Sequence, residues 1–395
     1  MINSKMYELG SRRSVIREIF EYGKKRKAEI GENNVFDFSI GNPSVESPEA
    51  VTERIRELLE VHPSTAVHGY TSAQGDPNAR QAIADDLNRR FNTTFTGNNV
   101  YLTCGAAASL TISLRSIIDA DDQNVMVFAP FFTEYRVFIE SMGAQIKVVP
   151  ASFPKLDLNL DAFERMINEK TVAVILNSPN NPTGVVYSEE QIKELAAILE
   201  KKSQEFNHPI YIISDEPYRE ITYGCKPPFI THYYSNSIIC YSYSKGLSLP
   251  GERIGYILVP DVMPDWQKMY AAVCGAGRSL GFICAPAMFQ HVITKCAPLT
   301  SDLSKYAANR ELIYNGLTEL GYECVRPDGA FYLFVKCLEE DAASFCMRAR
   351  KYDLLLVPSD DFGCPGYVRI AYCVSAETIK NAMPAFKALA ESYRQ

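Results

Sequence analysis

The chain has 395 residues, of which 47% are hydrophobic and 22% are charged, a composition that is typical of a well-packed globular protein and excludes extensive disorder. Its length exceeds what one ordinary hydrophobic core requires and predicts two domains. The net charge of -7 argues against a nucleic-acid-binding surface, which would be basic.

Targeting and metal-binding patterns are missing from the sequence. The N-terminal residues MINSKMYELGSRR lack the apolar core of a signal peptide, and no apolar run reaches the length of a membrane span. The 11 cysteines form no C-x-x-C pair, and the 5 histidines form no H-E-x-x-H motif. We therefore expect reduced thiols, no metal site, no membrane partner and a cytoplasmic location.

The first predicted element is a helix over residues 14–30. Its KKRK run is interpreted as a solvated helical face rather than a basic recognition patch, because the run is short and the protein is acidic. Two further helices are predicted from a capping residue followed by proline. Ser47 is expected to cap the helix that Pro48 opens, and Asp76 the helix that Pro77 opens.

Short apolar runs alternate with helical stretches between residues 100 and 260. The runs are rich in β-branched and aromatic residues with little alternation, which is typical of strands buried on both faces. They cover residues 100–103, 125–129, 146–149, 171–176, 210–214, 237–241 and 254–259. One intervening helix, 188–202, begins with a capping box of Ser188 and Gln191. The alternation predicts an α/β fold with a mostly parallel central sheet flanked by helices.

The pattern changes after about residue 285 to long helices with few strands. Helices are expected over residues 286–296, 301–320 and 375–393, and strands over residues 330–335, 354–357 and 367–371. This indicates a smaller α+β domain, against which the first 45 residues are expected to fold. The predicted large domain therefore covers residues 46–285, and the small domain covers residues 1–45 and 286–395.

Residues that follow the strands are the candidates for function, because open parallel sheets bind ligands at the carboxyl ends of their strands. The stretch CGAAASL, residues 104–110, follows the first strand and opens a helix. Its small residues and free N–H groups can bind a phosphate. The alternative is a tight packing turn between strand and helix. Neither a Rossmann fingerprint nor a P-loop is present.

Three more strand ends carry polar residues. NSPNNPTG, residues 177–184, forms a rigid turn that can aim an amide inward, with a plain sharp loop as the alternative. Asp215 and Tyr218 follow the next strand, and an acid at the end of a buried strand requires a cation. Ser242 and Lys245 follow the strand after that. A lysine alone would most often lie at the surface, but four such strand ends together indicate one site.

A phosphorylated pyridine aldehyde would use each of these groups. Lys245 can form a Schiff base with the aldehyde. Asp215 can keep the pyridine nitrogen protonated, so that the ring withdraws electrons from a carbanion. Asn181 and Tyr218 can hydrogen-bond the 3′-oxygen of the ring.

The phosphate is expected to bind Ser242 and Arg253, the arginine through a two-pronged charge-assisted contact. Both lie in SYSKGLSLPGERIG, residues 242–255, which resembles the lysine motif S-x-S-K-x-x-x-x-P-G-x-R-x-G of class I/II aminotransferases. NNPTG, D-E-P-Y and VRIAY follow the order of that family, so the resemblance covers nearly the whole chain. It implies a pyridoxal 5′-phosphate enzyme of fold type I, with a large and a small domain.

The resemblance implies roles for further residues. Arg369 in YVRIAY matches the arginine that binds the substrate α-carboxylate, and Gly41 in SIGNPS matches the glycine near that carboxylate. Phe132 in APFFTEY matches the aromatic residue stacked over the cofactor ring, although Phe131 beside it leaves the choice open. Tyr70 in GYTSAQG matches the tyrosine that reaches the phosphate of the neighbouring subunit, which implies a homodimer with shared active sites.

Some positions depart from the family or leave alternatives. Ala106 and Ala107 replace the glycine, serine, threonine or lysine often found in the phosphate loop, so only backbone N–H groups remain there, and Ser109 is expected to compensate. Arg278 in CGAGRSLGF lies where some relatives carry a partner-subunit residue for a distal carboxylate; the alternative is a structural or interface arginine. Asn181 completes the predicted substrate-binding set with Gly41, Arg278 and Arg369.

The implied activity is the ping-pong transfer of an amino group between an amino acid and a 2-oxo acid. Lys245, Asp215 and Tyr218 are the expected catalytic residues, with Lys245 as both tether and general acid/base. Aspartate is the leading donor and 2-oxoglutarate the expected acceptor, with alanine or an aromatic amino acid as other donors. A carbon–sulfur β-lyase, which shares the motif, is the alternative. A cofactor-sensing domain of a transcription regulator is disfavoured, because the first 35 residues are too few for a DNA-binding module.

Overall fold

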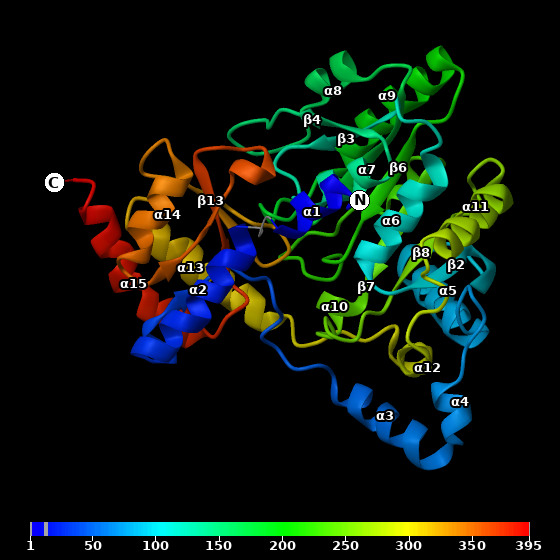
Figure 1. Ribbon diagram of the computed structural model, residues 1–395, viewed down its shortest axis with the longest axis horizontal. Coiled ribbons are helices and arrows are strands. Elements are labelled where there is room, and N and C mark those ends of the chain that lie inside the picture. Colours follow the sequence, from blue (N-terminus) through cyan, green and yellow to red (C-terminus); the bar gives the residue numbers. More distant parts are fainter. Residues whose placement is uncertain (1, 12–14, 395) are drawn as a thin grey trace.

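A seven-stranded sheet forms the centre of the computed structural model, which describes residues 2–11 and 15–394 (Figure 1). The strand order is β2-β8-β7-β6-β5-β3-β4. The strands are β2 (Val100–Thr103), β3 (Asn124–Phe128), β4 (Gln145–Val149), β5 (Thr171–Asn177), β6 (Tyr211–Asp215), β7 (Ser237–Ser242) and β8 (Gly255–Leu258). β8 is antiparallel to β2 and β7, and the other pairs are parallel. The prediction of a mostly parallel sheet flanked by helices is confirmed.

Helices cover both faces of this sheet, which explains why its inner strands are mostly apolar rather than alternating. All residues of β3 and β5 are buried. One face packs against α5 (Pro77–Phe91), α8 (Leu160–Met166), α9 (Glu189–Phe206) and α12 (Ala287–Cys296). The other face packs against α6 (Ala106–Ile117), α7 (Glu134–Ser141) and α11 (Trp266–Ser279).

Two of the three predicted helix starts are confirmed. The Asp76 side chain accepts hydrogen bonds from two N–H groups at the start of α5, and Ser188 forms a capping box with Gln191 at the start of α9. The third is wrong, because α3 (Glu49–Val61) has Pro48 as its N-cap and no side-chain hydrogen bond there. Pro48 has an extended ψ of 140°, so Ser47 lies one residue too early to cap.

A second, four-stranded sheet lies in the C-terminal part, in the order β12-β13-β10-β9. Its strands are β9 (Cys324–Val325), β10 (Tyr332–Lys336), β12 (Val357–Pro358) and β13 (Tyr367–Ala371), and its helices are α13 (Ser304–Glu319), α14 (Ala342–Arg350) and α15 (Ala376–Glu391). The N-terminal segment joins this part. β1 (Phe36–Asp37) pairs with β11 (Leu354–Leu355), and α2 (Val15–Ile30) lies on the same side of the molecule (Figure 1). Residue 14, where the predicted first helix begins, is outside the described residues.

The division into domains at residues 45/46 and 285/286 stays a prediction. α12 packs against α3 and α5, and its Val292 and Ile293 belong to the same hydrophobic cluster as the large sheet. This packing favours placing the second boundary after α12 rather than before it.

Several short elements complete the described residues. They are α1 (Ser4–Ser11), α4 (Ser64–His68), α10 (Tyr243–Gly246), and the 3-10 helices η1 (Glu32–Asn34), η2 (Gly97–Asn99), η3 (Ile230–His232) and η4 (Asp360–Phe362). Within residues 2–11 and 15–394, no helix is both long and apolar enough to span a bilayer.

Candidate active site

The predicted site residues gather in one cavity of about 350 Å³ between the large sheet and the C-terminal part. Its lining includes every predicted site residue except Tyr70, Arg278 and Ser109, the serine expected to compensate in the phosphate loop. The included residues are Gly41, Ala106, Ala107, Phe132, Asn181, Asp215, Tyr218, Ser242, Lys245, Arg253 and Arg369. A larger cavity of about 530 Å³ beside Arg90 and Lys226 contains none of them. Because the smaller cavity contains the predicted site residues, it is the candidate active site.

Strand order explains why these residues meet. β5, β6 and β7 are parallel neighbours, and their register pairs Asn177 with Asp215 and Asp215 with Cys240. The segments that follow these three strands therefore begin at one edge of the sheet. β2 lies antiparallel to β8 and hence parallel to β7, so the helix that follows β2 begins at the same edge.

Asp215 is buried and its carboxylate is only half satisfied. Its Oδ2 accepts a hydrogen bond of 2.5 Å from the hydroxyl of Tyr135, whereas no donor among the described residues reaches its buried Oδ1. Burial raises the pKa of Asp215 to about 7, the bond from Tyr135 opposes that rise, and the nearby Glu216 adds to it. A buried acceptor without a partner costs free energy. Oδ1 thus fits a ligand that donates a proton, such as a protonated ring nitrogen.

Lys245 lies in α10, directly after β7, and lines the cavity. Its Nζ donates a hydrogen bond of 2.6 Å to the carbonyl oxygen of Gly41. Burial is the largest cause that lowers the pKa of Lys245, to about 8, and the positive charges of Arg369 and Arg253 lower it further. At neutral pH a larger fraction of this amine is neutral, and so nucleophilic, than in an exposed lysine.

The start of α6 forms a candidate binding site for an anion. Gly105 precedes the helix with a φ of +84°, and a Cβ there would lie 2.9 Å from Nη2 of Arg253. Nη1 of Arg253 donates to Pro250 at 2.9 Å and to Ser244 at 3.4 Å. The first-turn N–H groups of α6 have no intrahelical acceptor. An arginine beside such a helix start fits a phosphate group.

Two serines near this anion-binding site have other positions or contacts than the sequence predicted. Ser244, which was not predicted, lines the cavity beside Ser242 and receives a hydrogen bond of 2.8 Å from it. Ser109 is fully buried and contacts Thr103 and the carbonyl oxygen of Tyr256 instead of the cavity. The expected compensation by Ser109 is therefore wrong, because its position in α6 turns its side chain toward the sheet.

The opposite end of the cavity holds Arg369 on β13. Its Nη1 donates to Oδ1 of Asn181 at 3.2 Å and its Nη2 donates to the carbonyl oxygen of Ser39 at 2.5 Å. Its Nε is buried without a partner among the described residues, and the guanidinium lies 4.7 Å from the ring centre of Tyr332. A held guanidinium with donors to spare suits a carboxylate.

A pair of phenols lies between the two ends. The hydroxyl groups of Tyr218 and Tyr332 are 2.9 Å apart. A Cβ on Gly41 would collide with the hydroxyl of Tyr332, so glycine is required at position 41 for this tyrosine to occupy its place. Tyr332 was not predicted, because the bond to Tyr218 joins residues 114 positions apart.

The open choice between two phenylalanines is decided by position. Phe132 lines the cavity and makes an edge-to-face contact with Tyr135, with ring centres 5.6 Å apart. Phe131 is buried in the hydrophobic cluster behind the sheet. Of these two phenylalanines, Phe132 is therefore the one available to a ligand.

Tyr70 and Arg278 do not reach the cavity of their own chain. Tyr70 is 100% exposed, and Arg278 is exposed in the last turn of α11. The sequence-based prediction assigns both to the site of a neighbouring subunit, and that assignment stays a prediction.

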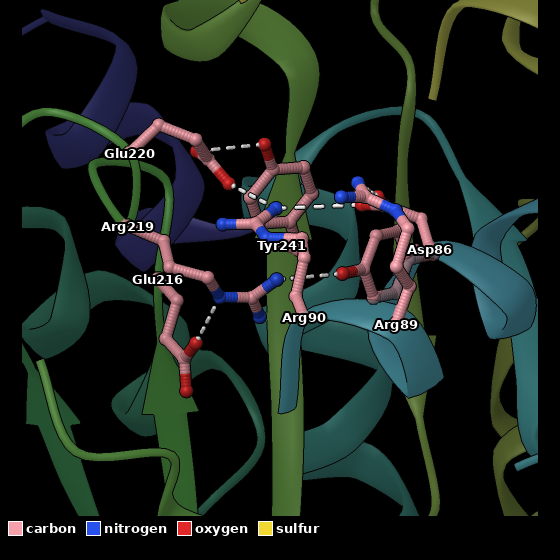
Figure 2. Close-up of polar contacts among 8 residues, drawn as sticks. Asp86, Arg89, Arg90, Glu216, Arg219, Glu220 and Tyr241 are labelled. Carbon is pink, nitrogen blue, oxygen red and sulfur yellow. Dashed lines mark hydrogen bonds and ion pairs between the residues drawn. The ribbon is translucent and has the colours of Figure 1, made fainter. Parts of the chain in front are cut away.

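Glu216, Arg219 and Glu220, in the segment that follows β6, form ion pairs and hydrogen bonds with neighbouring elements (Figure 2). Nε of Arg219 donates to Glu216 at 2.6 Å, and its Nη1 donates to the hydroxyl of Tyr256 at 2.9 Å. A second set of bonds joins Glu220 to Arg90 and Tyr241, and Asp86 to Arg90 and Arg89. It connects the turn after β6 to α5 and β7.

Comparison with known proteins gives one consistent description. Residues 33–386 match the family described as aminotransferase class I and II. An aspartate aminotransferase from Thermotoga maritima is 28% identical over 376 residues, which cover 93% of this chain and 95% of the relative. An aspartate aminotransferase from Bacillus subtilis is 26% identical over 387 residues, with 94% and 95% covered. A crystal structure of an amino transferase from Eubacterium rectale covers 100% of both chains with 55% identity and a TM-score of 0.98.

Proposed function

The chain belongs to the class I and II aminotransferase family, whose members depend on pyridoxal 5′-phosphate, and from this premise we propose that it binds this cofactor in the cavity described above. It then transfers an amino group between an amino acid, with aspartate as the lead, and a 2-oxo acid such as 2-oxoglutarate. The observation that carries the proposal is the buried, unpartnered Oδ1 of Asp215 in the cavity that also holds the amine of Lys245.

The cavity offers a matching group for each part of the cofactor. When bound, the cofactor supplies an aldehyde that captures amino groups and a protonated ring that withdraws electrons. Oδ1 of Asp215 accepts from the ring nitrogen. Tyr218 and Asn181 hydrogen-bond the ring oxygen, and Phe132 packs on the ring face. Arg253 binds the phosphate, together with Ser242 and the N–H groups of Ala106 and Ala107.

Lys245 has two roles in this proposal. Its amine holds the cofactor covalently before the substrate arrives. Once released, Nζ accepts the proton from Cα of the amino acid, and it returns a proton in the reverse half-reaction. A pKa of about 8 suits both tasks near neutral pH, because the amine is then neither fully protonated nor a strong base.

The substrate carboxylate binds Arg369, with Asn181 and Gly41 beside it. Two relatives are named aspartate aminotransferases, which makes aspartate the leading donor. A second carboxylate needs a second cation, and Arg278 from a second copy of the chain is our candidate. Tyr70 of that copy completes the phosphate site, so the active form is a homodimer.

The test is to mix cofactor-loaded protein with one amino acid at a time, without an acceptor. We expect aspartate to convert the bound cofactor to its amine form and release one equivalent of the 2-oxo acid per chain. Continued release of pyruvate and ammonia from a cysteine-type substrate would support the β-lyase alternative. A colourless protein that takes up no added cofactor would contradict the whole proposal.

A further inference from the structure

The side chain of Asn177 joins two of the proposed cofactor-binding residues. Asn177 is 5% exposed and lines the cavity. Its Nδ2 donates a hydrogen bond of 2.8 Å to the backbone carbonyl oxygen of Asp215, and its Oδ1 accepts one of 2.8 Å from the backbone N–H of Asn181. Both distances are in the range of strong amide hydrogen bonds.

The position of Asn177 in the sheet explains this arrangement. Asn177 is the last residue of β5 and is paired in register with Asp215, the last residue of β6. The chain then turns away at Ser178 and Pro179, and proline has no N–H group to extend the ladder. The side-chain amide of Asn177, with one donor and one acceptor, takes the place of the next peptide group.

Other side chains cannot make both bonds at this position. Aspartate is similar in size but lacks the donor, and leucine lacks both groups. Glutamine has both groups on an arm that is one methylene longer, which moves them away from the two backbone groups that asparagine reaches. An asparagine is therefore the residue that holds these two backbones at a fixed separation.

We propose that Asn177 is a positioning residue that sets the spacing between Asp215 and Asn181, and hence between the groups that bind the ring nitrogen and the ring oxygen of the cofactor. This inference rests on the proposed function. Asn177 holds the backbone of Asp215 while Tyr135 holds its Oδ2, so that the free Oδ1 is oriented from two sides.

A second buried asparagine beside the same sheet serves as a matched control. It allows a loss of stability alone to be distinguished from a loss of cofactor positioning. Asn99 is 2% exposed, and it donates to the carbonyl oxygen of Val259 at 3.0 Å and accepts from the N–H of Thr96 at 2.9 Å. Its side chain therefore also donates one hydrogen bond to a backbone carbonyl oxygen and accepts one from a backbone N–H group. It is the last residue of η2, directly before β2, and therefore lies at the opposite edge of the sheet from the cavity.

The experiment compares Asn177→Asp with Asn99→Asp, because each loses the same donor from a buried amide. Thermal unfolding, affinity of the cofactor-free protein for pyridoxal phosphate by absorbance titration, kcat and KM are measured for both. We expect similar losses of Tm. We expect only Asn177→Asp to lose cofactor affinity by about 10-fold or more and kcat on the order of 100-fold, the effect of misplacing reacting groups by about 1 Å.

Asn177→Ser keeps a hydroxyl for one of the two bonds and serves if Asn177→Asp does not fold; we expect intermediate losses of affinity and kcat. Wild-type affinity and kcat in the Asn177 variants, or equal losses in Asn99→Asp, would overturn the positioning role while leaving the proposed function intact. A wild-type protein that takes up no pyridoxal phosphate would instead overturn the proposed function, and this inference with it.

Discussion

Lys245 and Asp215 are buried ionisable groups whose surroundings shift their pKa values in opposite directions. Burial disfavours both charged forms, so it lowers the pKa of Lys245 to about 8 and raises that of Asp215 to about 7. The two groups therefore titrate close to neutral pH. We expect a cationic ring nitrogen at Oδ1 of Asp215 to favour its carboxylate form again, because an opposite charge stabilises the charged state.

The lowered pKa of Lys245 predicts how cofactor capture depends on pH. Only the neutral amine attacks an aldehyde, so the capture rate of the cofactor-free protein should rise with pH through a midpoint near 8. An ordinary lysine would place that midpoint near 10.5. The measurement is the initial absorbance change after mixing with pyridoxal phosphate at a series of pH values. Lys245→Ala is the control without covalent capture, and a midpoint at the ordinary value would contradict the prediction.

The turn after β6 is stabilised by a buried ion pair between Glu216 and Arg219 (Figure 2). Ser214 donates to the other carboxylate oxygen of Glu216 at 2.6 Å, and the guanidinium of Arg219 lies 4.6 Å from the ring centre of Tyr241. The pair is thus enclosed by partners on both sides. Because Tyr218 lies between the two residues in sequence, this element holds the phenol in the site.

Breaking the pair from one side should be costly. Arg219→Met leaves the carboxylate of Glu216 buried without a cation, which is expected to lower the free energy of unfolding by about 3–5 kcal/mol. The double variant Glu216→Gln, Arg219→Met removes both charges and should recover much of this loss. Denaturant unfolding measures both.

The control for this prediction is Arg136→Met, which removes an exposed ion pair with Glu140 on α7. An exposed pair contributes little, so we expect a small change in unfolding free energy. If Arg219→Met lost no more than this control, the buried pair would not be what stabilises the turn.

At the scale of the whole molecule, two predicted site residues, Tyr70 and Arg278, are exposed to solvent in the single chain. Tyr70 lies near α3 and α4, which occupy the lower edge of the molecule in Figure 1, away from the large sheet. Leu59 and Val61 of the same region are also exposed. In the proposed homodimer, we expect the second copy of the chain to cover these apolar side chains.

Mixed dimers test whether the sites are shared. Chains with Lys245→Ala are combined with chains with Tyr70→Ala under conditions that exchange subunits. In a shared-site dimer, the site with the wild-type Lys245 receives the wild-type Tyr70 of the other chain. We expect recovery of about a quarter of the wild-type activity, because about half of the dimers are mixed and one of their two sites is intact.

Each variant alone is the control for this mixing experiment, and sedimentation should report twice the mass of the chain. If mixing restored no activity beyond the sum of the separate variants, Tyr70 would act within its own chain or not at all.

The sequence by itself determined the large sheet and most of the residues that line the cavity. The seven strands β2 to β8 lie within a residue or two of their predicted positions. The reason is that a strand buried on both faces has a continuous run of apolar residues in the sequence. The polar residues that follow those strands could also be predicted from the sequence, since turn residues and the lysine motif are local patterns. The predicted cap at Ser47 failed by one residue, because proline decided the backbone geometry there.

Only the tertiary structure decided which hydrogen bonds join distant groups. The bond from Tyr135 to Asp215 spans 80 residues, that from Asn177 to Asp215 spans 38, and that from Arg369 to Asn181 spans 188. None of these pairs leaves a periodic or spaced signal in the chain. Local chemistry depends on neighbouring residues and is visible in sequence, whereas the spacing of remote groups depends on how strands and helices pack, which no short stretch encodes.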